Sequence, residues 1–81
     1  SGNMVPGDFV IYTSRVYRWL LVGEETPEKL LDLKLSEIRI QENEVYPVIQ
    51  VRMVNNFKGT MVQLLTPSGI GWISTEWLKV V

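Results

Sequence analysis

Carboxylates are the side chains on which any acid–base catalysis by this sequence would depend. The 81 residues include no His and no Cys, so a Ser–His–Asp or Cys–His arrangement cannot be assembled. A pair of carboxylates could still transfer protons. Asp8, however, follows Gly7 and is typical of a turn, and Glu76 lies in an expected short helical turn. Neither has an identifiable partner, so we predict no catalytic residues and a protein that is not an enzyme.

The same absences argue against a metal site or a cofactor. Cys-based zinc and iron–sulfur sites are excluded, and histidine, the commonest transition-metal ligand, is also missing. The carboxylates between residues 24 and 44 lack the ligand spacing of an EF-hand. No glycine-rich loop that could hold a phosphate is present. We expect no metal ligands and no cofactor.

Aromatic residues near arginines are the strongest candidates for a binding surface. Tyr17 and Trp19 lie among Arg15 and Arg18, a mixture found in protein interfaces and on base-stacking surfaces. The alternative is a strand with aromatic residues in the core and arginines in solvent.

A second aromatic pair, Trp72 and Trp77, is five residues apart across an expected turn. The two side chains could form a groove for an extended peptide. Alternatively, one fills the end of the core while the other packs on its rim.

Charge is unevenly distributed along a chain of net charge −1. Residues 24–44 carry a balance of −4, whereas residues 1–23 carry +1 and residues 45–81 carry +2. The acidic stretch could dock a basic partner or could be a solvated insertion. Nucleic-acid binders usually have a strong excess of cations. Such binding would require a basic stripe made of Arg15, Arg18, Arg52 and Lys58.

The length and composition indicate one ordered domain. Residues 1–3 precede Met4 as an expected cloning scar, which leaves residues 4–81 for a single domain. Hydrophobic residues make up 46% of the chain, which argues against disorder. No apolar run approaches the roughly 20 residues of a membrane span. No signal-peptide pattern is visible, and with the lack of Cys we expect a cytoplasmic location.

Short β-forming runs joined by tight turns dominate the chain. Together they predict five or six short strands in a small barrel. Within residues 46–54, alternation places Ile49 and Val51 opposite Val48 and Gln50. Residues 27–34 favour a short helix after Thr26, although alternating leucines there also fit a strand. Residues 74–77 predict one helical turn capped by Ser74.

The C-terminal residues 71–80, Gly-Trp-Ile-Ser-Thr-Glu-Trp-Leu-Lys-Val, resemble the close of SH3 domains. There a Gly-aromatic-Ile strand enters a one-turn helix, and a short strand ends the barrel. Residues 6–10, Pro-Gly-Asp-Phe-Val, look like the turn that opens such small barrels in bacteria and phages. Trp77 stands where SH3 domains have a ligand-contacting Tyr, but Ser74 replaces their Pro. The resemblance therefore implies an SH3-like fold without implying a proline-rich ligand.

These observations favour a non-catalytic protein–protein interaction or regulatory accessory module of bacterial or phage type. The alternatives are a weak RNA- or DNA-binding small barrel and a structural subunit of a homo-oligomer. The expected partner-binding surface is a rim of aromatic and cationic side chains: Arg15, Tyr17, Arg18, Trp19, Phe57 and Trp77.

Overall fold

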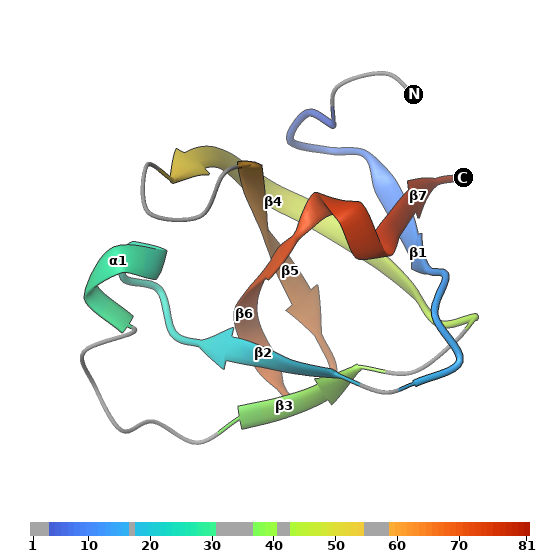
Figure 1. Ribbon diagram of the computed structural model, residues 1–81, viewed down its shortest axis with the longest axis horizontal. Coiled ribbons are helices and arrows are strands. Elements are labelled where there is room, and N and C mark those ends of the chain that lie inside the picture. Colours follow the sequence, from blue (N-terminus) through green and yellow to red (C-terminus); the bar gives the residue numbers. More distant parts are fainter. Residues whose placement is uncertain (1–3, 17, 31–36, 41–42, 55–58) are drawn as a thin grey trace.

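The computed structural model describes residues 4–16, 18–30, 37–40, 43–54 and 59–81, with the side chains of Trp19 and Glu37 left aside. Strands dominate these residues (Figure 1). In chain order, the strands are β1 (Phe9–Tyr12), β2 (Arg18–Val22), β3 (Glu37–Ile40), β4 (Val45–Val54), β5 (Gly59–Thr66), β6 (Gly69–Ser74) and β7 (Leu78–Val80). The helical elements are α1 (Pro27–Leu30) and the 3-10 turn η1 (Thr75–Trp77).

The strands form one antiparallel sheet in the order β3-β2-β6-β5-β4-β1-β7. The sheet curls strongly into a half-barrel, with β4, β5 and β6 linking the β1–β7 pair to the β2–β3 pair (Figure 1). The right-handed twist of antiparallel strands produces such curling. The C-terminal end of the chain lies beside β7, on the side of the sheet away from α1 (Figure 1).

The expected closed barrel of five or six strands is wrong in two respects. The described residues form seven strands, and their sheet is not closed. Closure would require β3 and β7, the two edge strands, to share hydrogen bonds. Instead, a side-chain contact between Arg18 of β2 and Trp77 of η1 joins the two ends of the sheet.

The two helical predictions fit the structure where it is described. The helix expected over residues 27–34 is α1, which begins at Pro27, and residues 31–34 lie outside the described residues. The Thr26 carbonyl accepts hydrogen bonds from the amides of Lys29 and Leu30. The predicted turn after Ser74 is η1, and the Ser74 hydroxyl accepts from the Glu76 amide at 3.4 Å. Among the described residues, no helix is both long and apolar enough to span a bilayer.

A main apolar core fills the inside of the curled sheet. Every strand contributes at least one buried residue to it: Val10, Tyr12, Leu20, Ile40, Tyr46, Val48, Val62, Leu64, Ile73 and Leu78. Burial on this scale is the principal source of folding free energy in a small domain. Because all seven strands contribute, the core holds the sheet in its curled form.

A second, smaller cluster lies on the outer face of the sheet, beneath α1. Its buried members are Leu30, Val54, Met61 and Trp72. Trp72 and Ile73 are neighbours in β6 but belong to different clusters. Successive residues of a strand point to opposite faces, so β6 carries core on both sides.

A β-bulge in β4 changes which residues face the main core. The register of β4 against β5 shifts between Val48 and Gln50. Val48 is buried at 3% exposure and Val51 packs against the same cluster, whereas Ile49 is 38% exposed. The predicted alternation, with Ile49 and Val51 on one face and Val48 on the other, is therefore wrong. One extra residue at a bulge reverses the phase of the strand that follows it.

Candidate functional site

A rim made of Arg15, Val16, Arg18 and Trp77 lies where the two ends of the sheet meet. The guanidinium carbon of Arg18 stands 3.3 Å from the centroid of the Trp77 ring. This is a close cation–π contact, in which the positive charge lies against the negative face of the ring. The contact fixes an arginine at the first position of β2 against an aromatic residue from the far end of the chain.

Hydrogen bonds tie the loop after β1 to η1 and so give the rim its shape. Both the amide and the hydroxyl of Thr13 donate to the Trp77 carbonyl, at 3.0 and 3.1 Å. The Ser14 hydroxyl accepts from the Val16 amide at 3.1 Å, a local bond that favours a tight bend. The buried Tyr12 donates its hydroxyl proton to the Val16 carbonyl. Thr13 therefore anchors the loop to η1, and the bonds to Val16 shape the bend that follows.

Trp77 combines a structural role with an available surface. Its side chain is partly buried and packs against the main core, while the neighbouring Glu76 is exposed. Tryptophan in such a position is amphipathic: one part of the ring stabilises the fold and another can contact a partner. The Arg18 guanidinium covers part of this ring.

Arg18 has no negatively charged partner among the described residues. Its Nε atom is buried and has no hydrogen-bond acceptor. The ion pairs in the described structure lie elsewhere, between Lys29 and Glu25 and between Arg52 and Glu28. A buried donor without an acceptor is unusual in native proteins. Arg18 thus stands out as a cation that is held in place and that no described residue neutralises.

The remaining rim residues are open to solvent. Val16 is 66% exposed, and Arg15 is exposed in the bend that precedes it. Arginine, tryptophan and an exposed apolar side chain together have the composition of an interface hot spot.

Of the predicted partner-binding residues, the structure brings Arg18 and Trp77 into contact and places Arg15 in the loop bound to η1. The backbone of Trp19 pairs with Arg39 of β3, but its side chain is not described. Tyr17 and Phe57 lie outside the described residues. Val16 was not among the partner-binding residues predicted from the sequence. Its position between Arg15 and Arg18 could have indicated that it belongs to the same surface.

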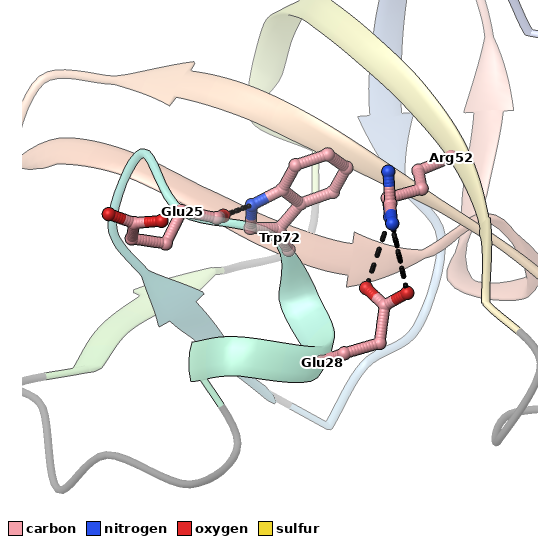
Figure 2. A network of polar contacts seen from close by, with 4 residues as sticks. All are labelled: Glu25, Glu28, Arg52 and Trp72. Atoms are coloured by element: carbon pink, nitrogen blue, oxygen red, sulfur yellow. Dashed lines mark hydrogen bonds and ion pairs between the residues drawn. The ribbon is translucent and has the colours of Figure 1, made fainter.

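Trp72 does not share a groove with Trp77. It is 1% exposed and belongs to the outer cluster, whereas Trp77 packs against the inner one. The Trp72 Nε1 donates to the Glu25 carbonyl at 2.8 Å, which joins β6 to the segment before α1 (Figure 2). The side chain therefore has a structural role.

A second polar contact near Trp72 secures α1 itself (Figure 2). Arg52 of β4 donates to both carboxylate oxygens of Glu28 at 3.1–3.3 Å. The hydrogen bond from Arg52 is the main cause that lowers the pKa of Glu28 below its ordinary value of 4.5. Both side chains remain substantially exposed, so this ion pair positions α1 and contributes little stability.

Two partly buried glutamine contacts join β5 to β4 and to the segment that precedes α1. Gln63 of β5 donates to the Gly23 carbonyl at 3.1 Å and accepts from Gln50 at 2.8 Å. These bonds satisfy a polar side chain that is buried beside Trp72. Across the described ranges, no group of three or more acidic side chains is placed to hold a metal ion.

The fold defines a class: a small all-antiparallel β domain with a curled, open, seven-stranded sheet in its described residues. Comparison of the chain with known proteins finds no matching family model, curated protein or solved structure.

Proposed function

We propose that this protein is a non-catalytic protein-interaction module, acting as an accessory or regulatory domain that binds a partner protein at the rim. The observation that carries the proposal is the Arg18–Trp77 stack, in which an arginine that no described residue neutralises lies near the exposed Val16 in the chain. Arginine and tryptophan dominate binding energy in protein interfaces. The hydrogen bonds from Thr13 to Trp77 preorganise this surface, which lowers the entropy lost on binding.

An SH3-like arrangement of the strands is part of the same proposal. The order β4-β5-β6, the turn η1 and the final strand β7 support it. In SH3 domains, the position that corresponds to Trp77 contacts the ligand. The Ser74 hydroxyl caps η1 where those domains have a Pro, so we propose a partner segment that is not proline-rich.

The distribution of cations favours a protein partner over RNA or DNA. Of the four cations that a basic stripe would need, Arg52 pairs with Glu28 on the outer face, and Arg18 lies at the rim. The two are on opposite faces of the sheet, because Arg18 is opposite the buried Ile40 and Arg52 is opposite Met61. Lys58 is outside the described residues. Phosphate binding depends on cations that converge.

Affinity purification of the tagged protein from its native host, with and without nuclease, tests the proposal. We expect a discrete partner protein that survives nuclease treatment. Val16→Glu should abolish its recovery, because a charge would be placed in the apolar part of the rim. The matched control is Met53→Glu, since Met53 is also a large exposed apolar residue, at 77% exposure, but lies in β4 away from the rim.

The outcomes separate the alternatives. A partner that binds the Val16 and Met53 variants equally well would place the interface elsewhere. Recovery only of proteins that disappear with nuclease would favour the nucleic-acid alternative. Recovery of the chain itself as the main partner would favour a homo-oligomeric assembly.

A further inference from the structure

We infer that the rim recognises a carboxylate on an acidic peptide segment, with Arg18 as the group that binds it. This inference rests on the proposed function and specifies the chemistry of the partner. Three observations support it: the geometry of Arg18, the positive charge of the segment that carries it, and the exposed apolar residue Val16.

The stacking leaves the terminal N–H groups of the guanidinium uncovered by Trp77, whereas the Nε is buried. Trp77 contacts the guanidinium face, with the central carbon 3.3 Å from the ring centroid. The N–H groups of arginine lie in the guanidinium plane and form a fork that matches a carboxylate. Stacking on an aromatic ring therefore does not compete with a bidentate hydrogen bond to a ligand. It also restricts the side chain before the ligand arrives.

No described residue supplies the counter-charge that Arg18 lacks. The buried Nε has no acceptor, and leaving a charged donor unsatisfied is costly. The nearest acidic residue in η1, Glu76, forms no ion pair with Arg18 in the described structure. A ligand carboxylate would supply the missing negative charge at the point where the protein has fixed a positive one.

The positive charge of the segment that carries Arg18 favours an acidic ligand. Residues 12–18 contain Arg15 and Arg18 and no acidic residue, although the whole chain has a net charge of −1. Arg15 is exposed in the loop tied to η1, so it adds a second positive charge to the approach. Complementary charge of this kind raises the association rate and suppresses wrong partners.

The exposed side chain of Val16 indicates that the ligand should have an apolar residue next to its acidic one. Its side chain is 66% exposed between the two arginines. An apolar residue next to the ligand carboxylate could cover Val16 and exclude water from the ion pair, which strengthens it. The inferred ligand is therefore an extended segment with Asp or Glu adjacent to an apolar residue.

Selection from a library tests this chemistry on the intact protein. Random 12-residue peptides displayed on phage are selected against the immobilised chain, and the enriched peptide is synthesised together with its Asn/Gln counterpart. We expect enrichment of Asp or Glu next to an apolar residue. Isothermal titration should show about tenfold or greater weakening of the Kd for the amide counterpart, as expected when one partner of a charged hydrogen bond is lost.

Arginine variants locate the binding site of the acidic peptide. Arg18→Gln should weaken the Kd about tenfold or more, whereas Arg18→Lys, which keeps the charge but loses the fork, should have a smaller effect. Arg52→Gln is the matched control, because Arg52 is an arginine on the outer face, and should leave the Kd unchanged. Circular dichroism of each variant verifies that the fold is retained.

Different outcomes would overturn the acidic-ligand inference and the protein-interaction proposal. Selected peptides that bind at the rim without acidic residues, or a library that yields no binder sensitive to Arg18, would overturn the inference. The protein-interaction proposal would still stand if the nuclease-resistant partner required Val16. Single-stranded oligonucleotide binding that is lost in Arg18→Gln, with no acidic peptide binding, would also overturn the inference and would favour a phosphate ligand.

Discussion

Arg18 and Arg52 show how residue type alone fails to define a role. Both are arginines in strands, and both were candidates for a basic surface. In the structure, Arg52 pairs with Glu28 and secures α1, while Arg18 stacks on Trp77 and has no counter-charge among the described residues. The difference arises from which residues the fold brings near each of them.

The ion pair of Glu28 leads to a pH-dependent prediction at this scale. The pKa of Glu28 is lowered in the folded protein, chiefly by the hydrogen bond from Arg52. A lowered pKa contributes stability above the unfolded-state value, and this stability is lost as pH falls through the folded-state value. We therefore expect Glu28→Gln to reduce the pH dependence of unfolding below about pH 4.5, the ordinary glutamate value.

Urea unfolding measured between neutral and acidic pH checks this expectation. Glu24→Gln is the matched control, because Glu24 is an exposed acidic residue in the same segment with no ion pair in the described structure. The effect should be small, since the Glu28–Arg52 pair is largely exposed and screened. Identical acid profiles for the Glu28 variant and the parent would contradict the assigned role of Arg52.

At the scale of elements, the close approach of β2 to β6 depends on Gly71. A Cβ atom added there would lie 2.7 Å from the Leu20 Cβ and 3.2 Å from the Leu21 carbonyl oxygen. Gly71 is paired with Val22 in the ladder that joins the β2–β3 pair to the rest of the sheet. Any larger residue must displace β2, and β2 carries Arg18.

We expect Gly71→Ala to destabilise the protein by about 1–3 kcal/mol, the usual cost of forcing extra volume into a packed core. Equilibrium urea denaturation measures this change. Ser68→Ala, an exposed substitution in the adjacent turn, should change the free energy of unfolding by no more than about 0.5 kcal/mol. A Gly71 variant as stable as the parent would show that β2 can shift without cost.

The helix α1 has four residues and depends on tertiary contacts. Isolated helices of this length are unstable in water. Leu30 is buried in the outer cluster, and the Trp72 indole is bonded to the Glu25 carbonyl just before the helix. Packing against the outer face of the sheet therefore determines where α1 lies.

We expect Leu30→Ala to destabilise the fold by about 2–5 kcal/mol, as for other buried leucines. The Trp72 indole proton should also exchange faster with solvent, because the segment that accepts its hydrogen bond is loosened. The control in the same helix is Lys29→Ala, whose exposed ion pair with Glu25 contributes little. Unchanged indole exchange in the Leu30 variant would show that Glu25 is held independently of α1.

At the scale of the whole molecule, the two apolar clusters share the strands β4, β5 and β6. Val62 and Met61 are neighbours in β5, yet one belongs to the inner cluster and the other to the outer. If β4, β5 and β6 unfold, the residues of both clusters become exposed. This arrangement favours cooperative unfolding of the described domain.

Tryptophan fluorescence on the two faces tests this cooperativity. Trp72 reports on the outer cluster and Trp77 on the inner one. The variants Trp77→Phe and Trp72→Phe each leave one of these two reporters, with Trp19 present in both. We expect the fluorescence and circular dichroism transitions to coincide within each variant. A separate early transition in the variant that retains Trp72 would indicate that the outer cluster unfolds on its own.

Several features could be predicted from the sequence because they depend on local interactions. The predominance of strands, the helix that begins at Pro27 and the turn capped by Ser74 all follow from the propensities and caps of neighbouring residues. The proximity of aromatic and cationic residues identified Arg15 and Arg18 as candidates, and the resemblance to SH3 domains identified Trp77.

Other features were decided only by the tertiary structure, because they depend on contacts between distant residues. The pairing of β2 with β6 and β3 places β3 at one edge of an open sheet of seven described strands. The bulge after Val48 reverses which face the later residues of β4 occupy. Trp72 is buried in the outer cluster, whereas Trp77 is only partly buried and packs against the inner one. The meeting of Arg18 with Trp77 joins residues far apart in the chain. Local patterns determine which elements form, whereas strand register and sheet curvature determine which side chains meet.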